Sequence, residues 1–193
     1  MARAIQKRTL ETRARLMAAA EEVIAESGFE AMRVEEVVLR AGTAKGTFFA
    51  HFKDKEALME LIIGARLDTL LDDIAAAPVP RTPEEMAETL TPFLSFMTSE
   101  RYVFDLSLRY SGATAIAEVG PIAMTFGRQV EVFAAWFKDD PPRTDIDAEL
   151  LAEGVMAFAI QAMSTNFCAL HNATSIHDRL VPYLKAWLNP SVS

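Results

Sequence analysis

Apolar residues recur at helical spacing along nearly the whole chain, and no segment shows the polar–apolar alternation of a half-buried strand. The first clear apolar face is formed by Leu16, Ala20, Val23 and Ile24. Gly28 follows where a left-handed residue would end this helix. Similar faces recur further along, so the pattern predicts an all-α protein of about nine helices.

Two short predicted helices lie on either side of a turn at Gly42. The first has valines at helical spacing over residues 34–38, and the second carries Phe48 and Phe52 four positions apart. Two short helices joined by a tight turn that contains glycine form a helix-turn-helix. The second helix of this motif can lie in the major groove of DNA. We therefore predict a helix-turn-helix at about residues 33–52.

The stretch AAAPVPRTPEE marks the first clear break after this motif. Within it Thr82 stands three residues before Glu85 as a capping box, and Pro83 occupies the first helical position. The same start signal recurs as Thr144 with Asp147 and as Ser175 with Asp178. We divide the chain into a first domain at residues 1–55, which holds the helix-turn-helix, and a second helical domain at residues 56–193.

Charge is distributed unevenly between these two parts. The 193 residues hold 19 basic and 27 acidic side chains, for a net charge of −8. Residues 1–60 hold ten of each, which leaves nine basic and seventeen acidic side chains for residues 61–193. Because salt screens each charge within ~8–10 Å, local charge matters more than the total. A nucleic-acid partner for the first part is therefore compatible with the acidic total.

The chain shows no signal for export or membrane insertion. The N-terminal stretch MARAIQKRTLETR lacks the apolar region of a secretory signal. No uncharged apolar run approaches the ~20 residues that span a membrane. We expect a cytoplasmic protein without a membrane partner.

The second helix of the motif combines apolar and polar residues on different faces. Phe48 and Phe52 share one face, which is expected to pack on the first helix. Gly46 lets a partner's backbone approach, and Lys55 adds a cation to the first turn of the next helix, where free N–H groups favour phosphate. The side chains left to other faces are Lys45, Thr47, Phe49 and His51.

Two other readings of this segment fail. GTAKGT has Lys-Gly-Thr where a phosphate-binding Walker loop needs Gly-Lys-Thr or Gly-Lys-Ser, and no strand precedes it. A membrane-surface helix needs a long apolar face, whereas two glycines interrupt this segment. A structural helix pair without DNA remains the common alternative on pattern alone.

The run RARLMAAAEEVIAESGFEAMRVEEVVLRAGTAKGTFFAHFKDKEALMELI resembles the N-terminal domain of TetR-type transcriptional regulators. The likeness covers about fifty residues in register, including Gly28-Phe29, Ala41-Gly42, Lys45-Gly46-Thr47, His51-Phe52 and Lys55. It implies an all-α homodimer with three DNA-binding helices ahead of about six effector-domain helices. Residues 1–55 would then be the DNA-binding domain, and residues 56–193 the effector-binding and dimerisation domain. The last two helices, at about residues 145–169 and 175–188, would make the dimer contact through Leu150, Leu151, Val155, Phe158, Leu180, Leu184 and Trp187.

The resemblance also implies roles for single residues. Ala44, Lys45 and Thr47 would face DNA, while Phe49, His51 and Lys55 would contact or approach the phosphate backbone. The family usually has Tyr where this chain has Phe49, and losing one hydrogen bond costs ~1 kcal/mol, so we expect weaker binding. Arg33 replaces the usual Ser or Thr cap and is a candidate phosphate contact.

An N-terminal basic arm is a further candidate. Arg3, Lys7 and Arg8 are expected to precede the first helix, where they would follow the DNA backbone or enter the minor groove. A solvated tail is an equal alternative.

Aromatic and methionine residues concentrate beyond residue 60, where they form either a core or an effector pocket. Our candidate ligand-binding residues are Phe93, Phe96, Phe104, Arg109, Tyr110, Phe126, Trp136, Phe158 and Asn166. Cys168 and His171 have no third group at ligand spacing, so we expect no metal site, no catalytic residue and no cofactor.

These features together favour a ligand-responsive transcriptional regulator rather than an enzyme. We expect a repressor that leaves a pseudo-palindromic double-stranded operator when a small apolar or aromatic effector binds the homodimer. The alternative is a helical small-molecule-binding or enzymatic protein that does not use its helix-turn-helix for DNA.

Overall fold

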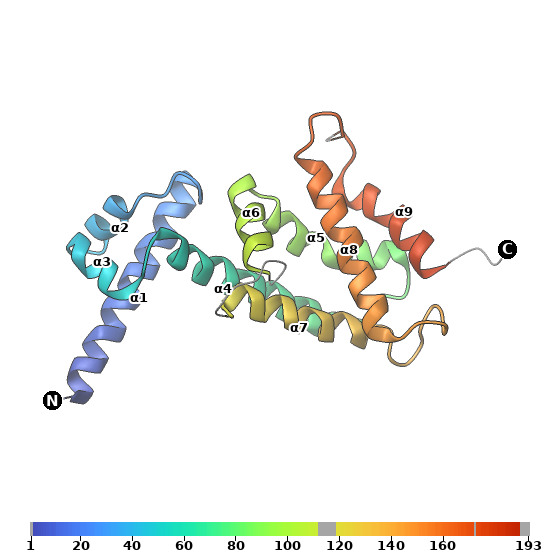
Figure 1. Ribbon diagram of the computed structural model, residues 1–193, viewed down its shortest axis with the longest axis horizontal. Coiled ribbons are helices and arrows are strands. Elements are labelled where there is room, and N and C mark those ends of the chain that lie inside the picture. Colours follow the sequence, from blue (N-terminus) through green and yellow to red (C-terminus); the bar gives the residue numbers. More distant parts are fainter. Residues whose placement is uncertain (1, 112–118, 172, 190–193) are drawn as a thin grey trace.

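The computed structural model describes residues 2–111, 119–171 and 173–189, with side chains from residue 6 onward. These residues form helices and no strand, which confirms the predicted all-α class with its nine helices (Figure 1). In chain order the helices are α1 (Ala2–Ser27), α2 (Val34–Arg40), α3 (Lys45–His51), α4 (Lys55–Ala76), α5 (Pro83–Met97), α6 (Arg101–Tyr110), α7 (Pro121–Ala135), α8 (Ala148–Asn166) and α9 (Ile176–Leu188).

Helices α1, α2 and α3 form one end of the molecule, and α4 leads from them to the other helices (Figure 1). Their apolar faces meet in a small core in which Leu16, Ala20, Val37, Phe48 and Phe52 are all buried. Such a core is the physical reason that these short helices keep a defined arrangement, because isolated helices of seven residues are unstable in water.

Helix α4 joins this end to the larger helical domain, where it packs mainly against α7. The two helices approach each other closely at Gly64, which lies in the interior of α4. A Cβ atom built on Gly64 would lie 2.9 Å from the Pro121 Cβ and 3.2 Å from the Ile122 backbone nitrogen. A glycine interior to a helix costs stability, so here it is explained by the close approach of α7.

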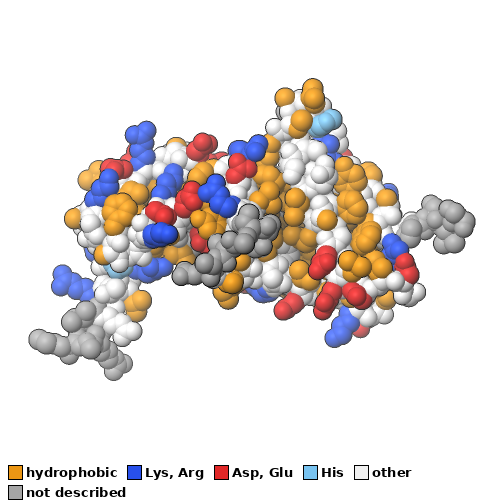
Figure 2. Space-filling view, in the orientation of Figure 1, with side chains coloured by type: hydrophobic (Ala, Val, Ile, Leu, Met, Phe, Trp, Pro, Cys, Tyr) orange, Lys and Arg blue, Asp and Glu red, His pale blue; other side chains and the backbone are white. Residues whose placement is uncertain are grey.

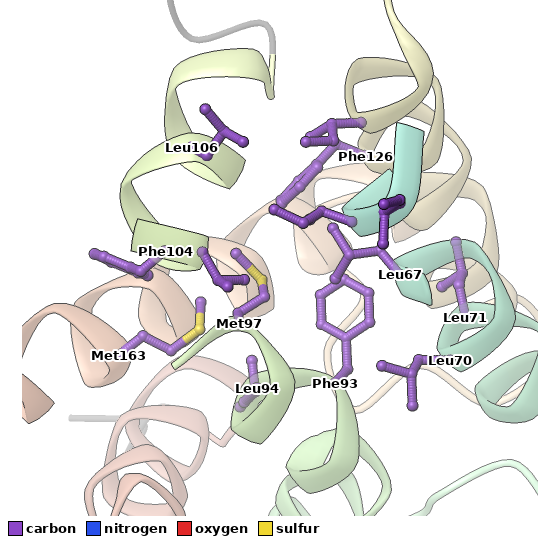
Figure 3. Close-up of a cluster of buried hydrophobic side chains, with 14 of the residues drawn as sticks. Leu67, Leu70, Leu71, Phe93, Leu94, Met97, Phe104, Leu106, Phe126 and Met163 are labelled. Carbon is purple, nitrogen blue, oxygen red and sulfur yellow. The ribbon is translucent and has the colours of Figure 1, made fainter. Parts of the chain in front are cut away.

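In the larger domain, helices α4, α5, α6, α7 and α8 all contribute side chains to an apolar core (Figure 3). The Phe93 and Phe126 rings meet edge to face with centroids 6.4 Å apart. The members of this core that Figure 3 labels are Leu67, Leu70, Leu71, Phe93, Leu94, Met97, Phe104, Leu106, Phe126 and Met163, all of them buried. Helix α9 packs on α5 and α8 and covers the far end of this core.

Most of the predicted helix starts are confirmed. The Thr82 hydroxyl accepts from the Glu85 N–H at 3.1 Å, and the Ser175 hydroxyl accepts from the Asp178 N–H at 3.0 Å. The start predicted at Thr144 was wrong, because Asp147 itself caps α8 by accepting from the Leu150 N–H at 2.8 Å. The sequence pattern assigned Asp147 to the first turn of a helix capped by Thr144, whereas Asp147 is the residue that precedes α8 and caps it.

The expected N-terminal arm was also wrong. Helix α1 begins at Ala2, so Lys7 and Arg8 are helical and exposed rather than part of an extended segment. The side chain of Arg3 lies outside the described residues. The first twenty residues lack a helix-breaking glycine or proline, which is why the helix extends through the basic stretch.

Candidate DNA-binding surface and effector domain

The turn between α2 and α3 has the geometry that its glycine predicts. Gly42 has φ of +61°, a left-handed conformation that ends α2. The Thr43 N–H donates to the Val38 carbonyl at 2.9 Å, and the Gly42 N–H donates to the Leu39 carbonyl at 3.1 Å. These two bonds form a Schellman motif, so the α2–α3 angle is set by backbone hydrogen bonds.

Helix α3 separates its two faces clearly. Phe48 is fully buried and Phe52 is 3% exposed, so both fasten the helix to the core as predicted. Phe49 is 50% exposed, and its ring meets the edge of the Phe48 ring at a centroid distance of 5.3 Å. Ala44, Lys45 and Gly46 are also exposed, while Thr47 and His51 are half-buried. Lys45, Gly46 and Phe49 therefore lie on the outward side of α3, whereas Thr47 and His51 lie closer to its buried face.

Arg13 is a site residue that sequence reasoning missed. Its guanidinium donates to the His51 carbonyl at 2.9 Å and lies 4.6 Å from the centre of the Phe52 ring. It therefore fastens the C-terminal end of α3 to α1. A cation three residues before Leu16 carries no local signal for this contact, because its partner lies 38 positions away.

Lys45 on the outward face of α3 has a partner on α2. Its ammonium lies 2.5 Å from a Glu35 carboxylate oxygen. This hydrogen bond is the main reason that the pKa of Glu35 lies below its ordinary value. Arg33 precedes α2, is exposed and makes no side-chain cap, as its residue type predicts. Both cations are exposed, and Lys45 is paired with the Glu35 carboxylate.

Lys55 lies in a different setting from the one expected. Its ammonium donates to the Glu30 carbonyl at 2.8 Å and lies 5.2 Å from the centre of the Tyr102 ring. Partial burial lowers the pKa of Lys55 and raises the pKa of Tyr102 to about 12. The side chain therefore holds the α1–α2 turn against α6, in addition to any contact with phosphate.

The nine candidate ligand-binding residues do not line one cavity. Phe93, Phe104 and Phe126 lie together in the core of the larger domain (Figure 3). Phe96 points to the junction with the DNA-binding end, where its ring contacts Phe29 at 6.0 Å. Trp136 lines a hollow of about 340 Å³ beside Pro80, Met86 and the loop that follows α7.

The other four candidates lie near the surface. Arg109 and Tyr110 both bind the Glu56 carboxylate in the first turn of α4, at 3.1 and 3.2 Å. Phe158 stacks on Tyr183 at 5.4 Å in the seam between α8 and α9, and Asn166 is the half-buried last residue of α8. These positions separate the candidates into core, junction and surface groups.

Two buried polar residues of the larger domain were not singled out from the sequence. Ser107 on α6 is fully buried and Gln129 on α7 is 1% exposed. Among the described residues, the Ser107 hydroxyl and the Gln129 side-chain oxygen have no hydrogen-bond partner, and the Gln129 nitrogen donates to the Met156 sulfur. Buried polar groups are usually paired, so these atoms are candidate contacts for a bound molecule. The sequence signal that could have identified Ser107 and Gln129 is a polar residue on an otherwise apolar face of a predicted helix.

Burial within α8 and α9 shows that part of the predicted dimer contact was wrong. Leu151, Val155, Leu180 and Leu184 are fully buried within the single chain, so their side chains belong to its core. The exposed surface of these helices includes the other predicted members, Leu150 at 44% exposed and the partly buried Phe158 and Trp187. Periodicity identified an apolar stripe but could not assign it to the inside or the outside.

Where the chain is described, no three His, Cys, Asp or Glu side chains are grouped to hold a metal ion. None of the described helices combines the length and apolar character that crossing a bilayer requires. Cys168 is half-buried with a free thiol.

Comparison with known proteins identifies the N-terminal region. Residues 16–62 match the family model of bacterial regulatory proteins of the tetR family. The HTH-type transcriptional regulator YvdT of Bacillus subtilis is 33% identical over 100 residues, which cover 51% of this chain and 50% of YvdT. The chain thus matches about half the length of that relative. The HTH-type transcriptional activator FasR of Mycolicibacterium smegmatis is 25% identical over 190 residues, covering 80% of this chain and 84% of FasR.

A solved structure extends the likeness over the full fold. Thermus thermophilus FadR, a TetR-family transcriptional repressor in complex with lauroyl-CoA, superposes with a TM-score of 0.65. It covers 94% of this chain and 95% of FadR at 17% identity, so it shows that the fold is shared. These relatives are transcriptional regulators rather than enzymes. Residues 16–62 are thus similar to the tetR family of bacterial regulatory proteins, and the described helices share the fold of a solved TetR-family regulator.

Proposed function

We propose that this protein is a homodimeric repressor that leaves its operator when a small apolar effector binds the larger helical domain. The single observation that supports DNA binding best is the outward side of α3. It presents Lys45, Gly46 and Phe49 to solvent, while Phe48 and Phe52 hold the helix from behind. Figure 2 shows basic side chains around this end of the molecule and an acidic group near the opposite end.

Salt dependence of DNA binding is the direct test. We expect the protein to bind the DNA beside its own gene more tightly than random DNA, with an affinity that falls steeply with salt. Changing Lys45 to Ala should reduce the salt slope by about 1, whereas Lys138→Ala, an exposed lysine after α7, should leave it unchanged. Equal affinity for both DNAs without salt dependence would refute the proposal. Lys55 is a poorer probe because it also holds Glu30.

Gly46 supplies a second, independent test of the DNA-facing side. It lies within α3, has no positive φ, and a Cβ added there would meet no atom within 4 Å. The protein alone thus has no need for glycine, whereas close approach of a DNA backbone would require it. We expect Gly46→Ala to stabilise the fold by ~0.5–1 kcal/mol while weakening operator affinity about tenfold.

The two measurements for Gly46→Ala are thermal unfolding and operator titration on the same preparation. Because alanine favours helix, a variant that is more stable and binds equally well would show that no partner approaches this position. Gly127→Ala, on the exposed side of α7, is the matched control and should gain stability without losing affinity.

Dimerisation is proposed through the outer surface of α8 and α9. Phe158, Tyr183 and Trp187 form a partly exposed aromatic group there, with ring centroids 5.4 and 6.2 Å from Phe158. A single helix-turn-helix makes few base contacts, and a two-fold dimer reads half-sites ~34–36 Å apart or multiples of that spacing. A pseudo-palindromic operator follows from this arrangement.

The effector is proposed to bind among α5, α6, α7 and α8. The aromatic core supplies apolar contacts, and the Ser107 hydroxyl and Gln129 oxygen are available to a polar group of the ligand. The complex of FadR with lauroyl-CoA makes an acyl compound the first to try. Adding lauroyl-CoA to the operator titration should release the protein from DNA if this effector class is right. Tighter binding would instead indicate an activator such as FasR.

A further inference from the structure

Glu100 connects two parts of the molecule that are distant in sequence. It precedes α6, and its carboxylate oxygens accept hydrogen bonds from the Phe29 N–H at 2.7 Å and the Glu30 N–H at 3.0 Å. Residues at the N-terminal side of a helix commonly cap that helix, but Glu100 makes no side-chain cap on α6. Its carboxylate instead holds the turn between α1 and α2.

The turn is shaped to receive this carboxylate. Gly28 has φ of +88°, and a Cβ built on it would lie 2.8 Å from a Glu100 carboxylate oxygen. The Glu30 carbonyl accepts from the Lys55 ammonium at 2.8 Å, so the turn is held through both its N–H and its C=O groups. Glycine is therefore favoured at position 28 for two reasons: its positive φ, and the Glu100 carboxylate that any side chain there would displace.

The other end of α6 is attached to the same side of the molecule. Arg109 and Tyr110 bind the Glu56 carboxylate in the first turn of α4. Between these two attachments, Phe104, Leu106 and Ser107 are buried in the larger domain, where an effector is proposed to bind. A displacement of α6 therefore reaches the α1–α2 turn directly through Glu100, as well as through α4.

We propose that Glu100 is a positioning residue that sets the orientation of the helix-turn-helix relative to the effector domain by clamping the amides of Phe29 and Glu30. This inference rests on the proposed function. Helix α2 begins four residues after Glu30, so the position of the turn determines where α2, and with it α3, begins. When α6 moves and withdraws the Glu100 carboxylate, the α1–α2 turn is no longer held. Helix α3 then samples more orientations, so a smaller fraction of the molecules has the orientation that binds the operator.

The test compares two variants that remove the same charge from the same region. Glu100→Gln neutralises the clamp and leaves its amide nitrogen facing a backbone N–H. Asp105→Asn neutralises a carboxylate on α6 that binds Arg101 within the same helix, at 2.8 Å. Both variants lose one negative charge, which by itself favours binding to DNA. The two variants therefore differ only in whether the hydrogen bonds from the Phe29 and Glu30 amides are weakened.

Two readouts decide the outcome. Amide hydrogen exchange at Phe29 and Glu30 should accelerate at least about tenfold in Glu100→Gln and not in Asp105→Asn, while exchange in α8 stays unchanged and reports an intact fold. Operator affinity should fall about tenfold in Glu100→Gln alone. Equal exchange or equal affinity in the two variants overturns the inference. Failure of the unmodified protein to bind operator DNA would instead overturn the proposed function.

Discussion

Changing Phe48 to Ala should lower the free energy of unfolding by about 3–5 kcal/mol, the range for phenylalanine truncation in protein cores. Phe48 is fully buried, and its ring contacts those of Phe49 and Phe52, each with centroids 5.3 Å apart. The core beneath α3 is small, so little surrounding structure is available to fill the cavity. Operator binding should be lost together with the orientation of α3. Urea unfolding and operator titration measure the two effects.

Phe49→Ala is the matched control, because it removes the same side chain from the next position. Phe49 is 50% exposed, so its truncation should cost less than about 1 kcal/mol of stability. If the two variants lost equal stability, the assignment of the inward and outward sides of α3 would be wrong. A loss of DNA affinity in Phe49→Ala without loss of stability would place its ring against the DNA backbone.

Gly64→Val should be the second most damaging change, with an expected loss of about 1–3 kcal/mol from overpacking. The first added atom would already lie 2.9 Å from the Pro121 Cβ and 3.2 Å from the Ile122 nitrogen. Backbone cannot move aside as a flexible side chain does, so α7 must shift away from α4. Those two helices form the most extensive helix–helix contact of the fold. Thermal unfolding of the variant measures the loss.

The control for Gly64→Val is Gly127→Val, a helical glycine with no heavy atom within 4 Å of its Cβ position. Valine favours helix slightly more than glycine does, so this variant should be neutral or slightly more stable. Similar destabilisation of both variants would show that helix propensity, and not the α4–α7 contact, explains the effect.

Several features of the candidate site were predictable because they are local. The spacing of Phe48 and Phe52 identified the buried side of α3, and Gly42 identified the turn before it. Thr82 and Ser175 were recognised as caps because a cap and its acceptor lie within four residues. In each case the physical cause acts within one turn of helix, and the sequence displays it directly.

Other features depend on residues that only the fold brings together. Arg13 meets His51 across 38 positions, and Glu100 meets Phe29 across 71. The position of Lys55 against Tyr102 also follows from how α6 packs on α4. No local pattern encodes such contacts, because each requires two helices to be placed before the side chains can meet.

The sequence by itself therefore determined the all-α class, the helix-turn-helix and the faces of its second helix. Helical periodicity predicts which side of a helix is buried, but it does not predict which other helix or chain covers that side. For that reason only the tertiary structure separated the aromatic candidates into core, junction and surface, and only it placed Leu151 and Leu184 inside the chain. It also assigned Glu100 to the α1–α2 turn, because that contact joins residues about 70 positions apart that only the packing of the helices brings together.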